Sequence, residues 1–109
     1  MKAKVVRKSE SKLILEDHEI ARLYIDHDKI VFGISRLLPG QRGPIDPGHV
    51  NAYEVWFVVK GNVACYFPDD EVSEELNEED VILIPPKKRH QLVNIGDSIA
   101  IVAWSQAKF

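Results

Sequence analysis

Side chains of the kinds that bind divalent metals lie in two separate segments of the chain. In "DPGHVNAYEVWFVVKG", residues 46–61, His49 precedes Glu54 by five positions, and "PPKKRHQLVN", residues 85–94, contains His90. Two imidazoles and one carboxylate are the ligand set that holds iron(II) or a similar ion while leaving coordination positions open. If the fold turns His49, Glu54 and His90 toward one another, two imidazoles and a carboxylate lie side by side, and these three residues become candidates for a metal site.

A fourth ligand could come from the loop around His49. Asp46 lies three residues before His49 in a stretch rich in Gly and Pro, and its carboxylate would reach the same ion after a small shift of the loop. Asn51 is a second, weaker oxygen donor nearby. We expect Asp46 to be the better candidate of the two.

The strand that follows His49 explains why Glu54 needs a partner. In a strand, alternate residues share a face, so Glu54 lies on the same face as Trp56 and Val58. A carboxylate on such an apolar face is costly to bury unless it is paired, hydrogen-bonded or bound to a cation. A metal-free cluster, in which the two imidazoles hydrogen-bond the carboxylate, satisfies the same requirement and stays open as an alternative.

Two residues are candidates for contact with a substrate. Trp56 would offer a flat apolar wall beside Glu54, although an aromatic residue here can also simply fill the core. Arg36, in "GISRLLPG", would pair with an anionic substrate if it faces inward, and would be solvated if it faces outward.

The elements that must position these side chains are short and β-rich. Alternating or apolar segments separated by turn residues predict strands, a cadence typical of an all-β sandwich or barrel. The segments are 3–6, 12–16, 20–25, 29–38, 53–60, 62–67, 80–85, 89–95 and 99–105.

Residues 69–80 contain eight acidic side chains and are the one serious helix candidate. They lie between two predicted strands, so we expect a hairpin whose exposed strand carries the acids and is kept from edge pairing by their charge. The basic residues 87–89 would partly neutralise it.

The composition predicts one globular domain spanning residues 1–109. Hydrophobic residues make up 45% and charged residues 28% of the 109-residue chain, and the formal charge of −3 makes nucleic acid an unexpected partner. No apolar run is long enough to span a membrane, and the first residues lack the apolar stretch of a signal peptide, so we expect a cytoplasmic location. The single cysteine, Cys65, has apolar neighbours and is expected to pack in the core.

The two metal-binding segments resemble the two motifs of the cupin superfamily. The first motif runs Gly, five residues, His-x-His, three or four residues, Glu, six residues, Gly. The second runs Gly, five residues, Pro-x-Gly, two residues, His, three residues, Asn. The resemblance covers about residues 38–104, and the matching positions are His49, Glu54, Gly61, Pro85, His90 and Asn94.

The departures from the motifs bear on function. Pro47 stands where the first His of the family would be, and its side chain cannot ligate a metal. Glu79 replaces the opening Gly of the second motif, and Lys87 replaces the Gly of Pro-x-Gly, so this turn must be built without the conformational freedom of glycine.

The resemblance implies a fold, a cofactor and a range of functions. The fold would be a double-stranded β-helix, or jelly-roll barrel, and the cofactor a divalent ion such as Fe, Mn, Ni or Zn on His49, Glu54 and His90. The ion would activate a small organic substrate in a reaction of the dioxygenase, isomerase, epimerase or lyase type. The alternative is a metal-free module that binds a sugar or organic acid. Family members commonly form homodimers through N-terminal strands, here residues 1–16.

Overall fold

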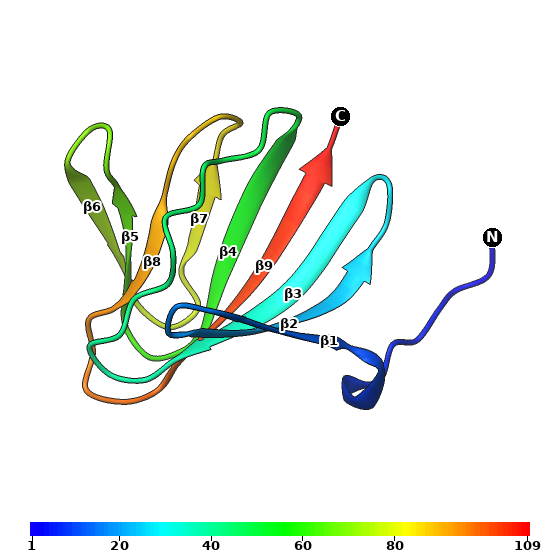
Figure 1. The fold of residues 1–109 in the computed structure, drawn as a ribbon, viewed down its shortest axis with the longest axis horizontal. Coiled ribbons are helices and arrows are strands. Elements are labelled where there is room, and N and C mark those ends of the chain that lie inside the picture. Colours follow the sequence, from blue (N-terminus) through cyan, green and yellow to red (C-terminus); the bar gives the residue numbers. More distant parts are fainter.

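The computed structural model describes residues 1–109 and consists almost entirely of β-strands, with one 3-10 turn at Lys8–Glu10 (η1) (Figure 1). The strands are Lys12–Glu16 (β1), Glu19–Asp26 (β2), Ile30–Leu37 (β3), Ala52–Lys60 (β4), Val63–Phe67 (β5), Val72–Leu76 (β6), Val81–Ile84 (β7), Gln91–Asn94 (β8) and Ala100–Lys108 (β9). The all-β prediction is confirmed. The segment 3–6, predicted as a strand, is not one, because the neighbouring β1 pairs only with β2 and leaves residues 3–6 without a partner.

The strands form two antiparallel sheets that face each other. One sheet has six strands in the order β1-β2-β3-β9-β4-β7, and the other has three in the order β6-β5-β8. Figure 1 shows the three-stranded sheet on the left and the larger sheet curving away to the right. This is the predicted jelly-roll arrangement, in which long connections return the chain from one sheet to the other.

Strand β4 shows how the larger sheet separates the core from the surface. Glu54, Trp56 and Val58 are buried on its inner face, whereas Tyr53 and Phe57 are exposed on its outer face. The period-two alternation of the sequence therefore places Glu54 inside the molecule.

A buried asparagine joins the two sheets near the end of β8. The Asn94 amide nitrogen donates to the carbonyls of Leu37 and Ser98 at 3.0 and 2.9 Å, and its amide oxygen accepts from the Gly96 N–H at 2.9 Å. All three bonds are satisfied within the fold, so this motif residue fixes the connections between strands.

The acidic stretch forms the predicted hairpin. β6 pairs with β5, and its first four residues are exposed. Lys88 forms an ion pair with Asp70, and an Arg89 nitrogen lies 2.7 Å from an Asp69 oxygen. The predicted neutralisation of the hairpin by residues 87–89 is confirmed in this form.

The two positions that have lost the glycines of the second motif keep a left-handed backbone. Glu79 has φ of 70° and Lys87 has φ of 66°. A residue with a Cβ in this region costs about 1–2 kcal/mol. Both positions therefore keep the backbone conformation that glycine favours, and each carries local strain.

The loop between β3 and β4 is held along the start of β8. The Asp46 N–H donates to the His90 carbonyl at 2.7 Å, the His90 N–H donates to the Asp46 carbonyl at 3.0 Å, and the Lys87 N–H donates to the His49 carbonyl at 2.7 Å. Figure 1 shows this loop running beside β8. These bonds place Asp46 and His49 next to the His90 segment.

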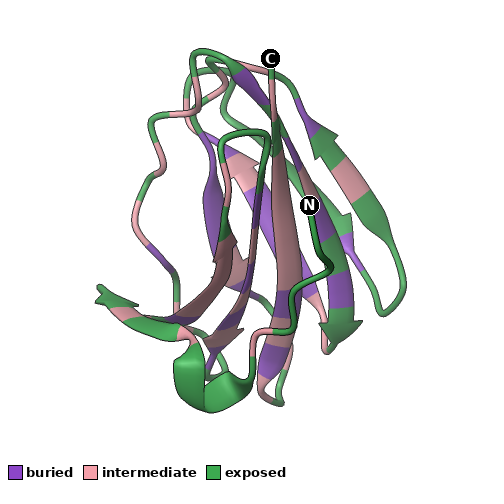
Figure 2. Cartoon of the chain, turned by 90° about the vertical axis from the view of Figure 1, so that its right-hand side faces the viewer, coloured by how far each residue is buried: buried purple, intermediate pink, exposed green.

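The N-terminal segment lies on the outside of the molecule. Residues of η1 are exposed, as the green turn near the bottom of Figure 2 shows. No helix in the structure has the length and apolar character needed to cross a membrane.

Candidate metal centre

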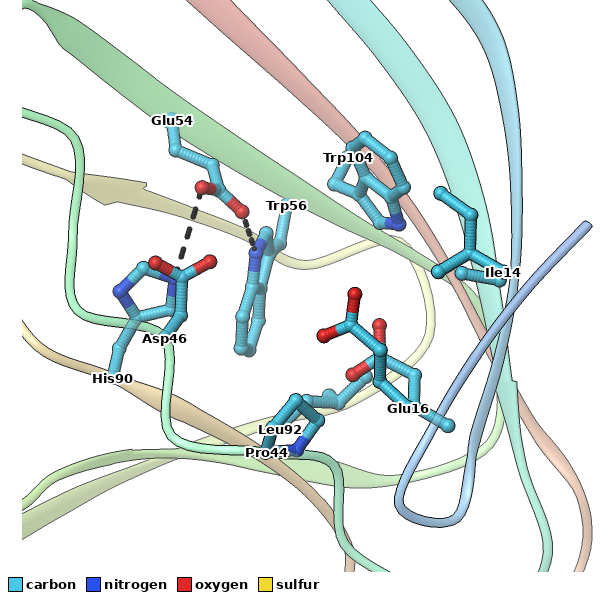
Figure 3. A pocket seen from close by; sticks show the side chains of 11 residues that line it. Ile14, Glu16, Pro44, Asp46, Glu54, Trp56, His90, Leu92 and Trp104 are labelled. Carbon is cyan, nitrogen blue, oxygen red and sulfur yellow. Dashed lines mark hydrogen bonds and ion pairs between the residues drawn. The ribbon is translucent and has the colours of Figure 1, made fainter. Parts of the chain in front are cut away.

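Glu54 lies at the centre of the site, with one carboxylate oxygen held and the other free. The residue is 6% exposed. Its Oε2 accepts a hydrogen bond of 2.7 Å from the Trp56 indole N–H, two residues along the same strand (Figure 3). Its Oε1 is buried and has no hydrogen-bond partner. The strand therefore fixes the carboxylate while leaving Oε1 available.

His49 approaches that free oxygen from the end of the β3–β4 loop. Its Nε2 lies 3.2 Å from Glu54 Oε1, but the contact lacks hydrogen-bond geometry, and Nε2 too is buried without a partner. Native proteins leave few buried polar atoms unpaired, so a facing pair of them requires an explanation.

His90 reaches the same oxygen from the start of β8 and is 2% exposed. Its Nδ1 lies 2.8 Å from the Lys88 carbonyl, which can only accept, so Nδ1 carries a proton in this contact. Its Nε2 lies 3.7 Å from Glu54 Oε1. A backbone contact on one ring nitrogen commonly orients a metal-binding histidine and presents the other nitrogen to the ion.

Asp46 completes the cluster. Its Oδ1 accepts from the Gly48 N–H at 2.8 Å, and its Oδ2 lies 3.8 Å from His90 Nε2. One ligand atom from each of Asp46, His49 and Glu54 lies within 4.8 Å of the others. Figure 3 shows the Asp46 carboxylate in front of the His90 ring, below Glu54.

The candidate ligands thus approach one another from three parts of the chain. Asp46, His49 and Glu54 form the compact group, and His90, which is not one of these three, lies 3.7 Å from Glu54 and 3.8 Å from Asp46. Asn51, the weaker alternative, is exposed. The unpaired His49 Nε2 and Glu54 Oε1 are what a centre for a cation requires, and the donor set of imidazoles and carboxylates matches a divalent transition metal. The residues present therefore fit such an ion.

The charges in the cluster are strongly coupled. Burial raises the pKa of Glu54, but the close imidazoles of His49 and His90 and the Trp56 bond outweigh burial and lower it to about 2. The nearby carboxylate of Glu54 raises the pKa of His49, and this increase is larger than the decrease that burial causes. Burial lowers the pKa of His90, but Glu54, the Lys88 carbonyl and Asp46 together raise it. The carboxylate is therefore ionised, and without metal the imidazoles tend to hold protons.

A cavity of about 160 Å³ adjoins the cluster. Trp56 and Trp104, which are register partners on β4 and β9, line it together with Leu92. Glu16 and Glu19, from either side of the β1–β2 turn, line it as well. Trp56 thus occupies the wall expected for it, as well as belonging to the core.

Glu19 was not identified from the sequence as a residue of the cavity. It is held by a hydrogen bond from Ser35 Oγ, which in turn accepts a bond of 2.8 Å from the Trp104 indole N–H. Burial raises the pKa of Glu19 despite the Ser35 bond. The alternation of Glu19 with the buried Ala21 was the available signal, but it is short and begins at a turn.

Arg36 does not face the cavity. Its neighbours Ser35 and Leu37 are buried on the inner face of β3 at 0% and 1% exposure, so alternation places Arg36 on the outer face, and it does not line the cavity. The inward placement considered for Arg36 is therefore wrong, and the solvated alternative fits. Ser35 is the inward polar residue at this level.

Cys65 lies in the core apart from the cluster. It is fully buried, and burial, with the charges of Glu54 and Glu74, raises its pKa to about 12. The thiol is a packing residue, as expected.

Comparison with known proteins identifies the family and the fold. The family model described as a cupin domain matches residues 33–105. No curated protein matches the chain. Solved structures that resemble it include an uncharacterised conserved protein with a double-stranded β-helix domain from Klebsiella pneumoniae, 17% identical, with 98% of this chain and 91% of that chain covered and a TM-score of 0.80.

Two further structures have functional descriptions. A predicted oxalate decarboxylase from Thermotoga maritima is 17% identical, with 97% of this chain and 100% of that chain covered and a TM-score of 0.79. The polyketide cyclase RemF from Streptomyces resistomycificus is 21% identical, with 97% of this chain and 80% of that chain covered and a TM-score of 0.76. At these identities the similarity establishes the fold.

Proposed function

The chain belongs to the cupin family, and from that premise we propose that it is a metal-dependent small cupin that activates a small organic substrate. The ion would be held by His49, Glu54 and His90, with Asp46 as a fourth ligand. The observation that carries the proposal is the pair of buried atoms without hydrogen bonds, His49 Nε2 and Glu54 Oε1, which face each other beside the cavity.

The chain's own residues prepare the site for this role. Trp56 orients Glu54, the Lys88 carbonyl fixes the His90 ring, and the turn at Asp46 holds that carboxylate beside His90. When bound, a divalent ion supplies Lewis-acid polarisation of a carbonyl or hydroxyl oxygen. The apolar walls limit the access of water to a substrate in the cavity, which strengthens electrostatic contacts there.

Several reaction types are compatible with this arrangement. Imidazole and carboxylate ligands suit iron, manganese, nickel and zinc. The structural neighbours include a predicted oxalate decarboxylase and a polyketide cyclase, which supports lyase-type chemistry among the reaction types expected for the family.

Elemental analysis of protein purified without chelator tests the proposal. We expect near-stoichiometric metal in the wild type and in His18→Ala, a matched control because His18 is exposed on a turn. His90→Ala and the milder His49→Gln should lose the metal while circular dichroism reports an intact β fold. Wild-type protein that takes up no metal, even after incubation with each ion, would instead identify a metal-free module for small ligands.

We also propose a cytoplasmic homodimer. β1 is an edge strand of the six-stranded sheet, and its Leu13 and Leu15 are 50% and 66% exposed, which suits an interface formed by residues 1–16. Sedimentation velocity should detect a dimer that Leu15→Lys weakens. A wild-type monomer at high concentration would contradict the proposal.

A further inference from the structure

The cavity beside the metal cluster has an unusual distribution of charge. Four carboxylates line it, from Glu16, Glu19, Asp46 and Glu54, and no lysine or arginine does. The only basic side chain on its wall is His90. Of these carboxylates, Glu54 is 6% exposed, and its Oε1 is unpaired on the cavity side of the strand.

The carboxylates fall into two groups on different elements. Asp46 and Glu54 belong to the proposed metal cluster, and a divalent ion would balance their two charges. Glu16 and Glu19 belong to the β1–β2 hairpin and have no cationic side chain beside them in the cavity. In Figure 3 the hairpin residue Ile14 and Trp104 lie on the side away from His90 and Asp46. The hairpin side of the cavity therefore stays negative when the ion is bound.

The direction of the hydrogen bonds shows which atom of Glu19 is available. An indole N–H can only donate, so Ser35 Oγ accepts a hydrogen bond from Trp104 and donates its own O–H to Glu19 Oε2. No hydrogen bond within the chain reaches Glu19 Oε1, which lies against Gly43. The two hydrogen bonds from Trp104 to Ser35 and from Ser35 to Glu19 thus hold Oε2 of Glu19 and leave its Oε1 free to accept. Glu54 is arranged in the same way by Trp56.

We propose that this cavity binds a small organic cation, an amine or quaternary ammonium group, with Glu19 as its charge partner and the indoles of Trp56 and Trp104 as its walls. The inference rests on the proposed function, since it names the substrate class of the same site. Cations bind favourably to the faces of indole rings, because the ring electrons attract the positive charge. An anion would meet the uncompensated carboxylates of Glu16 and Glu19, and a bare metal ion would make no use of the indole walls.

The size of the cavity sets the size of the ligand. Its volume of about 160 Å³ is close to the roughly 150 Å³ of an engineered cavity that holds benzene. A ligand of about that size fits, which includes choline and short alkylamines. The raised pKa of Glu19, caused mainly by burial, agrees with a carboxylate that lacks a counter-charge until a cation enters.

Calorimetry with choline as the probe tests this inference. Its uncharged isostere dimethylbutanol, in which carbon replaces nitrogen, and the anion dimethylbutanoate serve as matched ligands at constant ionic strength. We expect choline to bind at least about tenfold more tightly than the alcohol, and the anion not to bind, because only choline gains the cation–indole contacts and the Coulombic attraction of Glu19. Equal binding of choline and the alcohol, or no binding of choline, would overturn the proposal.

Two variants isolate Glu19. Glu19→Gln removes the charge but keeps an oxygen to accept the Ser35 bond, and should weaken choline binding by about tenfold or more, because the Coulombic attraction between Glu19 and the cation is lost. Gly43→Ala keeps the charge but displaces the carboxylate, because a Cβ there would lie 2.2 Å from Glu19 Oε1. The control Glu74→Gln changes an exposed acid on β6 and should bind as the wild type does. Unchanged affinity in Glu19→Gln would exclude the assigned role.

Metal content, measured on the same samples, separates this inference from the proposed function. Glu19 is not one of the clustered ligand residues, so Glu19→Gln should retain the wild-type metal content. Choline binding that depends on Glu19 in a protein without metal would refute the metal-dependent function alone. Bound metal without selectivity for choline would refute the cation proposal alone.

Discussion

Raising the pH of the metal-free protein from about 6 to about 8.5 should weaken its fold, because the imidazoles of His49 and His90 lose the protons that balance the charge of Glu54. The pKa values of His49 and His90 are raised above 6.5 in the folded state. Their contribution to the free energy of unfolding is therefore complete below pH 6.5 and is lost as the pH rises through their pKa values in the folded state. The pKa of Glu54 is lowered from 4.5 to about 2, so its contribution is present above pH 4.5 and is lost as the pH falls toward 2. Metal-free protein should be most stable between these limits.

The magnitude follows from the burial and the distances. His90 is 2% exposed, and each proton that the folded state retains changes the free energy of unfolding by about 1.4 kcal/mol per pH unit. His49 has a side chain that is 32% exposed and contributes less, because water screens its contact. The 3.7 Å separation of His90 Nε2 and Glu54 Oε1 corresponds to an attraction of about 4.5 kcal/mol at an effective dielectric constant of about 20, before desolvation is subtracted. We expect a loss of about 1–2 kcal/mol per pH unit just above pH 6.5.

Urea denaturation in the presence of EDTA, followed by circular dichroism at several pH values, measures this slope. Glu54→Gln should flatten the curve above pH 6.5, whereas Glu74→Gln, an exposed acid on β6, should leave it parallel to the wild type. Adding the metal should reverse the decline, because the ion replaces the protons and binds more tightly as they leave. A wild-type stability that stays level or rises from pH 6.5 to 8.5 would refute the proposed contact between the imidazoles and an ionised Glu54.

Three further changes test local features of the structure. Gly48→Ala should destabilise the fold by at least about 1 kcal/mol and abolish metal binding, because φ is 86° at this position and a Cβ would lie 2.8 Å from the Lys88 backbone. Urea denaturation measures the stability and elemental analysis the metal content, and wild-type values in both would contradict the close approach of this turn to Lys88. Lys87→Gly should stabilise the protein by up to about 1 kcal/mol in the same urea assay, because glycine removes the strain of a φ of 66° and this gain exceeds the extra conformational entropy that glycine loses on folding. A destabilised variant would show that contacts of the Lys87 side chain contribute more to stability than its backbone strain costs. Cys65 should resist Ellman's reagent at pH 8 until urea is added, because it is fully buried with a pKa of about 12, and rapid labelling of the folded protein would place it elsewhere.

The sequence predicted the strands and the inward orientation of Glu54 and His90 well, because both depend on short patterns. Alternation in β4 was enough to place Glu54 inside, and the spacing around His90 placed its ring on the matching face of β8. The same rule, applied from the buried Leu37, would have turned Arg36 outward.

The remaining features depend on contacts between distant segments. Asp46 was a candidate from its place in the sequence, but its position depends on its backbone pairing with His90, which no local pattern in a Gly- and Pro-rich loop can specify. Glu19 enters the cavity because the β1–β2 hairpin folds over it and Ser35, on the next strand, supplies the bond that holds the carboxylate. The first strand predicted, at 3–6, has the composition of a strand but no neighbour to pair with.

The chain contains two tryptophans, and both line the cavity. Their intrinsic fluorescence therefore originates entirely at the site, with no indole elsewhere to dilute the signal. A paramagnetic ion would quench this emission, and displacement of water by a ligand would shift its maximum to shorter wavelength. Occupancy of the cavity could thus be followed in real time on the unlabelled protein.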